Sequence, residues 1–195
     1  SSHAINVSLY SKLPYDPIKH FQPITMIGSM PNILVVRADS PYKSVQDVIA
    51  AAKANPNAVN SASSGNGTSQ HLSGVFFEQK SGSKMVHVPY KSSAESLNAL
   101  LSGQGADIIF ENLAPALPHI KAGKLRALGV TSDKRSPALP EVPAIAEALP
   151  GFSVESWQAI FAPAGVPKPV VDKLADAMIK AVNDPDIKSK LVAQG

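Results

Sequence analysis

Short apolar runs alternate with helix-like segments through the middle of the chain, and this alternation constrains the fold more than any other feature. The strand-like runs are AVNSAS, KMVHVPY, ADIIFEN and LRALGVTS, and segments with apolar residues at helical spacing separate them. Strands joined by helical crossovers pair in parallel, and continuous apolar strands are covered on both faces. The sequence therefore predicts an α/β fold with mostly parallel sheets and flanking helices.

The flanking parts of the chain predict further elements. Two β-branched runs at residues 24–27 and 33–36 lie on either side of Pro31, and we expect two separate strands there. Ser44, followed by Asp47 three residues later, is typical of a helix start. Four prolines between residues 132 and 152 indicate a surface excursion with one short helix. After Pro167 the spacing predicts two helices.

Composition excludes several classes of function. The formal net charge is only +3 and the basic residues are scattered, so we expect no nucleic-acid partner. The absence of cysteine excludes disulfides, thiol catalysis and zinc–thiolate sites. No apolar run has the length of a membrane span, so we expect no direct membrane insertion. The five histidines lack metal-ligand spacing, and we expect no metal and no cofactor.

A glycine- and serine-rich loop, SASSGNGTSQHLSG at residues 61–74, lies at a predicted strand-to-helix junction. It lacks the lysine of a P-loop, and Gln70 stands where a dinucleotide fingerprint has its third glycine. What remains is a helix N-terminus, where free N–H groups and the helix dipole favour an anion. The alternative is a tight turn with Thr68 as an ordinary helix cap. We predict an anion site with added hydroxyl donors from Ser63, Ser64, Thr68 and Ser69.

Two further polar junctions follow the next strands. Tyr90, Ser92 and Ser93 precede a predicted helix, and Glu111 with Asn112 ends the strand after it. Carboxyl ends of parallel strands share one edge, where open α/β sheets bind ligands. For Ser92 the alternative is a helix cap, and for Tyr90 it is a half-buried ring at a strand end.

No nucleophile with an oriented base is visible at these junctions, and we expect a protein that holds an anion without being an enzyme. His71 is predicted to lie in the first helical turn, facing the loop. A serine hydrolase that uses Ser64 and His71 is an alternative, although no GxSxG elbow surrounds either residue.

Several segments resemble the substrate-binding proteins of tripartite tricarboxylate transporters, the Bug family. They are YDPIKHFQPIT, PNILVV, GNGTSQHL, VPYK, LPHIKAGKLRALGVTS and KRSPALP, in register over nearly the whole chain. The resemblance implies a two-lobed periplasmic binding protein fold of type II, monomeric when full length. It implies capture of a small carboxylate in a cleft between the lobes: a di- or tricarboxylate, an amino acid or an aromatic acid. The ligand would pass to the permease subunits in the membrane.

The resemblance also implies a domain organisation. Family members usually begin upstream with a signal peptide, so the chain resembles a fragment that lacks the N-terminal part of the first lobe. Residues 32–124 would form the complete, ligand-binding second lobe. Residues 1–31 and 125–195 would supply part of the first lobe, with hinge strands and C-terminal helices.

Carried over to this sequence, the family's contacts predict a specific set of ligand-binding residues. Ser92 stands where glycine is common, and Glu111 stands where aspartate is common. A module that binds the same ligand and signals to a receptor or regulator is an alternative to transport. The predicted contacts are Ser63, Ser64, Gly65, Asn66, Gly67, Thr68, Ser69, His71, Tyr90, Ser92, Ser93 and Asn112, with Ser2 and His3 from a first-lobe loop.

Overall fold

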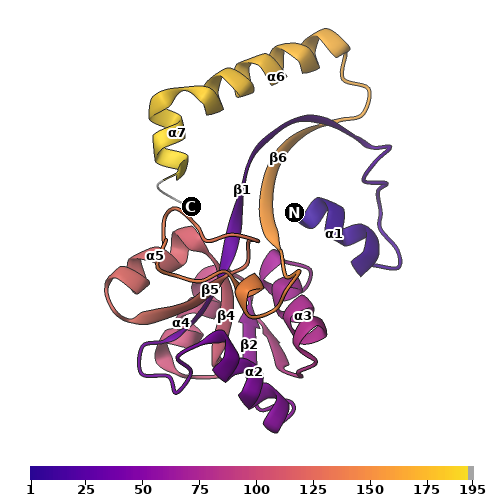
Figure 1. Cartoon of the computed structure of the whole chain (residues 1–195). Coiled ribbons are helices and arrows are strands. Elements are labelled where there is room, and N and C mark those ends of the chain that lie inside the picture. Colours follow the sequence, from indigo (N-terminus) through magenta and orange to yellow (C-terminus); the bar gives the residue numbers. More distant parts are fainter. Residues whose placement is uncertain (193–195) are drawn as a thin grey trace. The chain divides into compact units, whose positions relative to one another are not determined.

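The computed structural model describes residues 1–192, which divide into two compact units (Figure 1). The larger unit comprises residues 30–155, and the smaller comprises residues 1–29 together with the segment that begins at residue 156. The larger unit therefore extends beyond the expected 32–124. Residues 125–155 belong to it because β5 (Leu125–Val130) pairs with the second half of β1 (Phe21–Arg37).

The sheet of the larger unit is mixed. Its strand order is β3-β2-β4-β1-β5, where β2 is Asn60–Ser63, β3 is Val86–Pro89 and β4 is Ile108–Asn112. β2 pairs in parallel with β3 and β4, as predicted, whereas β1 is antiparallel to both β4 and β5. The expected parallel arrangement is wrong for β1: it runs opposite to β2, so the segment 38–59, which contains α2, leaves and re-enters the sheet at the same edge.

Two helical layers cover the sheet of the larger unit. Ile33 and Val35 face one core cluster with α4 (Ser93–Ser102) and α5 (Leu113–Lys121). Leu34 and Val36 face a second cluster with α2 (Val45–Ala54) and α3 (Ser69–Ser81). Because successive strand residues point to opposite faces, one strand supplies both cores. Coverage on both faces is as predicted.

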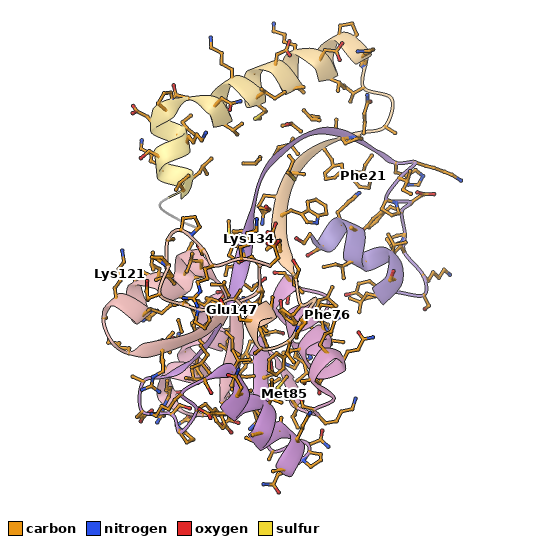
Figure 2. The ribbon with its side chains drawn as sticks, in the orientation of Figure 1. Phe21, Phe76, Met85, Lys121, Lys134 and Glu147 are labelled. Atoms are coloured by element: carbon orange, nitrogen blue, oxygen red, sulfur yellow. The ribbon has the colours of Figure 1, made fainter. Side chains whose placement is uncertain are left out.

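Aromatic side chains close the second cluster. The ring of Phe76 stacks on that of Phe152 with centroids 5.2 Å apart, and Phe77 packs edge-on against Phe152. Figure 2 labels Phe76 and Met85, which both pack on this cluster. Phe152 belongs to the proline-rich segment, whose one short helix is the 3₁₀ turn Ile145–Glu147. The segment therefore completes the core as well as running along the surface.

Three helices of the larger unit, α2, α3 and α4, begin where local capping signals predicted them. Ser44, Thr68 and Ser92 each accept a hydrogen bond from the backbone N–H three residues further on, at 3.2 to 3.3 Å. Such a bond satisfies one of the free N–H groups in the first helical turn. The cap roles considered for Thr68 and Ser92 are therefore confirmed.

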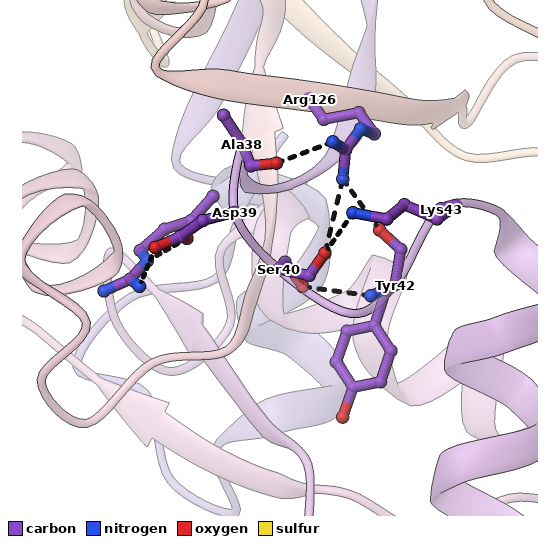
Figure 3. Close-up of polar contacts among 7 residues, drawn as sticks. Ala38, Asp39, Ser40, Tyr42, Lys43 and Arg126 are labelled. Carbon is purple, nitrogen blue, oxygen red and sulfur yellow. Dashed lines mark hydrogen bonds and ion pairs between the residues drawn. The ribbon is translucent and has the colours of Figure 1, made fainter.

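Arg126 on β5 holds the turn between β1 and α2 (Figure 3). Its Nη2 donates to Ala38 O at 2.6 Å, and its Nη1 donates to Tyr42 O at 3.2 Å and to Ser40 O at 3.4 Å. Lys43 Nζ donates to the same Ser40 carbonyl at 2.7 Å. One planar guanidinium therefore satisfies three backbone acceptors of the turn.

The smaller unit contains α1 (Ser2–Leu9), the first half of β1, β6 (Glu155–Pro163), α6 (Lys168–Asn183) and α7 (Pro185–Val192). β6 pairs with β1. The two strands expected on either side of Pro31 are one continuous strand. Pairing with β4 and β5 starts at Asn32 and Ile33, so the missing N–H of Pro31 interrupts neither ladder.

Among residues 1–192 the structure contains no helix with the length and apolar composition needed to cross a membrane.

Candidate functional site

The predicted polar junctions lie side by side at one edge of the larger unit's sheet. Ser63 at the end of β2 pairs with Pro89 at the end of β3, and Tyr90 N donates to Ser63 O at 2.8 Å. β4 pairs in parallel on the other side of β2 and ends at Asn112. The carboxyl ends of the three strands thus share an edge, as their parallel direction requires.

The side chain of Glu111 connects the three junctions through hydrogen bonds. Its side chain is fully buried. Oε1 accepts hydrogen bonds from Gln70 Nε2 at 2.5 Å and from Asn112 N at 2.8 Å, and Oε2 accepts from Ser93 Oγ at 2.8 Å. Burial raises the pKa of Glu111 to about 7, although the hydrogen bonds from Ser93, Asn112 and Gln70 oppose that rise. The carboxyl therefore titrates near neutral pH.

Gln70 carries the connection on to the glycine loop. Its Oε1 accepts from Ser64 N at 2.6 Å, while its Nε2 donates to Glu111. The sequence pattern predicted neither Gln70 nor Glu111 as a ligand contact, and Gln70 served only as an argument against a dinucleotide site. The available signal was position: Gln70 lies on the same helical stripe as buried Ser73, Gly74 and Phe77. A glutamine on a buried stripe needs polar partners.

Several amides of the loop serve the loop itself. Gly65 N donates to Ser63 Oγ at 3.1 Å, and Gly67 N donates to His71 Nδ1 at 3.2 Å. Thr68 N donates to Gly65 O at 3.4 Å, and Thr68 Oγ1 donates to the same carbonyl at 2.8 Å. These groups are already hydrogen-bonded within the loop. Fewer backbone N–H groups are therefore available to an anion than the sequence predicted.

Other donors of the loop remain uncommitted. Among residues 1–192, the backbone N–H groups of Asn66, Ser69 and Gln70 form no hydrogen bond with another protein group, and neither do the hydroxyls of Ser64 and Ser69. Ser69 and Gln70 are the first two residues of α3. The N–H groups of a first helical turn lack an intrahelical partner. The arrangement can donate hydrogen bonds to an anion at this helix start.

Two imidazoles stack behind the loop. The rings of His71 and His87 have centroids 3.9 Å apart and are inclined by 19°. His87 Nε2 lies 2.6 Å from the hydroxyl of buried Ser63. Burial lowers the pKa of both histidines, and for His87, where the neighbouring His71 adds to the effect, it falls to about 4. Both rings are therefore neutral at pH 7.

His71 lies in the first turn of α3 and faces the loop, as predicted. In the part of the chain that the structure describes, no hydrogen bond joins the Ser64 hydroxyl to His71, the pair on which the hydrolase alternative depends. The histidine in contact with a serine hydroxyl is His87 instead. Its partner Ser63 also contacts the backbone of Gly65, which ties this pair to the loop's own structure.

The remaining predicted contacts of the larger unit face different partners. The Ser93 hydroxyl donates to Glu111. The Tyr90 ring packs against the core and its hydroxyl lies beside Gly105, so Tyr90 meets the loop through its backbone only. Asn112 Oδ1 accepts from Asn32 Nδ2 at 3.3 Å. Within residues 1–192, the buried Asn32 Oδ1 has no hydrogen-bond partner.

Ser2 and His3 lie in helix α1 of the smaller unit, and the loop expected there is wrong. The ring of His3 stacks on Phe161 with centroids 4.5 Å apart and meets Phe21 edge-on at 4.8 Å. His3 Nε2 lies 2.8 Å from Pro17 O. A ligand contact of either residue stays a prediction.

The described residues form no group of three or more His, Asp or Glu side chains that could hold a metal ion.

Comparison with known proteins gives one family over the whole chain. The TctC family model, described as tripartite tricarboxylate transporter family receptor, matches residues 1–195. A curated relative, the UPF0065 protein in the tcbD-tcbE intergenic region of Pseudomonas sp. strain P51, is 38% identical over 188 residues. The match covers 95% of this chain and 56% of the relative.

Solved structures give the same picture. Rpa4515 of R. palustris with adipate superposes with a TM-score of 0.93 at 35% identity, covering 100% of this chain and 65% of that chain. The periplasmic binding protein BugD gives 0.90 at 31%, covering 99% and 64%. MatC of Rhodopseudomonas palustris with bound malate gives 0.90 at 31%, covering 99% and 66%. The chain thus spans between half and two thirds of the length of these proteins.

Proposed function

Because the chain belongs to the tripartite tricarboxylate transporter receptor family, we propose that it binds a small carboxylate and delivers it to the permease of such a transporter. Members of this family are periplasmic solute-binding proteins, and the periplasm is the location we propose for this one. Two similar structures hold the dicarboxylates adipate and malate, which supports a carboxylate ligand here. Delivery to permease subunits and a monomeric state are proposed for the natural protein as a whole.

The observation that carries the proposal for this chain is the pair of uncommitted amides at the start of α3. Ser69 N and Gln70 N begin a helix of 13 residues, so the positive end of the helix dipole lies behind them. A carboxylate oxygen that accepts from such N–H groups gains charge-assisted hydrogen bonds of about 1.5–3 kcal/mol each. The hydroxyls of Ser64 and Ser69, which are uncharged donors like the backbone N–H groups, can donate further hydrogen bonds.

The site holds a ligand without an evident means to transform it. Gln70 and Glu111 fix the loop through buried hydrogen bonds, and Ser63 with His87 fixes the strand end behind it. These groups position donors and do not offer an exposed nucleophile. We therefore propose binding and release as the activity of this site.

A proline at position 69 tests the amide directly. Proline is favoured at the first helical position, and the residue before it must be extended, as Thr68 is with φ −78° and ψ 162°. Ser69→Pro removes the N–H and the hydroxyl, whereas the matched variant Ser69→Ala removes only the hydroxyl. The difference between the two isolates the amide.

Titration calorimetry on the natural protein, including any residues that flank this chain, provides the measurement. We expect Ser69→Pro to bind adipate about tenfold or more weakly than Ser69→Ala. Adipamide, which has the same length but no charge, should bind none of the proteins. Equal affinity of the two variants for adipate, with unchanged circular dichroism, would remove this amide from the site. If none of adipate, malate, citrate, glutamate and benzoate raises the melting temperature in a thermal-shift experiment, the carboxylate proposal itself is overturned.

A further inference from the structure

The Gln70 side chain joins Glu111 to the helix start that is proposed to meet the ligand. In the described part of the chain the Gln70 backbone N–H forms no hydrogen bond with another protein group, and the Gln70 side chain donates to Glu111 Oε1. Ser64, whose hydroxyl is uncommitted, is held by the same glutamine. Only the Gln70 side chain therefore connects the buried carboxyl of Glu111 to the proposed carboxylate site.

No cation compensates the charge of Glu111 in the described part of the chain. It forms no ion pair, and its three hydrogen-bond donors are all neutral. β4 contacts β2, α3, α4 and α5 and pairs with β1. None of the charged and titratable side chains on those elements bonds to Glu111: Arg37 on β1, His71, Glu78 and Lys80 on α3, Glu95 on α4, and His119 and Lys121 on α5, with none on β2.

The hydrogen bonds around Glu111 suit both of its protonation states. Oε1 accepts from Gln70 and Asn112 whether or not the group is ionised. Oε2, once protonated, can donate to Ser93 Oγ, because a serine hydroxyl is both donor and acceptor. Protonation thus changes the charge behind the loop while every neighbour keeps a partner. Its pKa of about 7 places this change in the neutral range.

We infer that Glu111 takes up a proton from solvent when a carboxylate binds at the start of α3, so that ligand affinity depends on pH through this one buried group. The inference rests on the proposed function. A second negative charge close by in a water-poor environment disfavours the ionised carboxyl. Ligand and proton therefore bind together: the ionised Glu111, one proton and the anionic ligand give the neutral acid with the ligand bound.

Linkage sets the expected size of the effect. With one proton taken up, the affinity for adipate should fall by up to about tenfold per pH unit as the pH rises above 7. Glu111→Gln imitates the neutral acid: its carbonyl oxygen accepts from Gln70 and Asn112, and its NH₂ donates to Ser93. This variant should bind with little pH dependence, and more tightly than the parent at pH 9.

The matched control is Glu95→Gln. Glu95 is an exposed carboxylate on α4 near the same sheet edge, and it accepts from Lys91 N at 3.2 Å. This variant loses the same formal charge without touching the buried group. It should keep the pH dependence of the parent protein, which separates Glu111 from a general effect of net charge.

The experiment is calorimetry with adipate and with malate between pH 7 and 9, where both ligands are fully ionised. Each titration is run in phosphate and in Tris, because the difference in buffer ionisation heat counts the protons taken up. We expect uptake in the parent protein and in Glu95→Gln, and none in Glu111→Gln. Zero uptake in the parent, or equal uptake in all three, would overturn the inference while leaving the proposed function intact.

A measurement without ligand keeps the inference testable if neither acid binds, an outcome that would count against the proposed function. Carbon NMR of the side-chain carboxyl of Glu111 follows its titration in the free protein. A midpoint near 7 agrees with the inference, and a midpoint near 4.5, the ordinary value, overturns it. This readout also covers the case in which Glu111→Gln fails to fold.

Discussion

The side-chain amide of Gln70 donates to the buried carboxylate of Glu111 at 2.5 Å. Because the NH₂ group must face the carboxylate, the amide oxygen is turned toward the loop, where it accepts from Ser64 N at 2.6 Å. One glutamine therefore sets the start of the glycine loop from the end of a neighbouring strand. The positions of the uncommitted donors at Ser64 and Ser69 follow from this bridge.

Replacing Gln70 with methionine should loosen the loop. The change keeps the volume but leaves Ser64 N without a partner and removes one of the two hydrogen bonds to Glu111 Oε1, and it should cost about 1–3 kcal/mol of unfolding free energy. Urea denaturation measures the stability, and calorimetry with adipate should show weaker binding. Gln104→Met, at an exposed glutamine, is the control and should change stability by less than about 0.5 kcal/mol. Equal effects of the two substitutions would contradict the role of the bridge.

Stability should fall as the pH rises through the titration of Glu111. The pKa of this carboxyl is about 7 in the folded state against an ordinary 4.5, so the folded protein keeps a proton that the unfolded chain releases between these values. The stabilisation is complete below pH 4.5 and is lost as the pH rises to about 7, with a size of about 3 kcal/mol. Urea denaturation at pH 5 and pH 8 should show this loss in the parent and not in Glu111→Gln. An identical loss in the variant would assign it to another group.

His87 should act in the opposite direction at acid pH. Burial and the adjacent His71 lower its pKa to about 4 from an ordinary 6.5, so the unfolded chain takes up a proton that the folded protein refuses. Its contribution to stability is complete above pH 6.5 and is lost as the pH falls toward 4. Denaturation curves at pH 7 and 4.5 should differ less for His87→Gln than for the parent protein. Exposed His20, replaced by glutamine, serves as the control and should leave the acid loss unchanged.

Arg126→Ala should destabilise the larger unit by about 2 kcal/mol, because three backbone carbonyls of one turn lose a charged donor. Arg126→Lys should recover only part of this, since an ammonium group cannot reproduce the planar fork. Thermal denaturation of both variants measures the effect. Arg135→Ala is the comparison: it breaks an exposed ion pair with Glu147 and should cost at most about 1 kcal/mol. If the two alanine variants proved equally stable, the guanidinium at position 126 would not hold the turn.

The parts of the fold that depend on neighbouring residues could be predicted from the sequence. Helix starts at Ser44, Thr68 and Ser92 rest on a side chain and an amide three residues apart, and all three are confirmed. The alternation of strands and helices likewise predicted that β2, β3 and β4 run parallel with their carboxyl ends at one edge, and the structure has them so. These are local signals or simple consequences of chain connectivity.

What could not be predicted depends on contacts between distant residues. β1 lies between β4 and β5 and runs antiparallel to both, and neither its place nor its direction is encoded in a local pattern. The bonds that occupy Gly65 N and Gly67 N come from side chains whose rotamers the sequence does not state. Glu111 was noticed as a strand-end acid, but its role requires knowing that Gln70 and Ser93 converge on it.

Alternate side chains of β1 face the two core clusters. The packing of both helical layers in the larger unit therefore depends on the number of residues in this strand. Deleting Ile33 would turn Leu34 and Val35 to the opposite faces of the sheet, so that both helical layers lose their matching side chains together. Asn32, opposite Asn112, would shift away from the sheet edge that carries the glycine loop in the same step. A deletion there would reverse which β1 side chains face each helical layer, so its effect would not stay local.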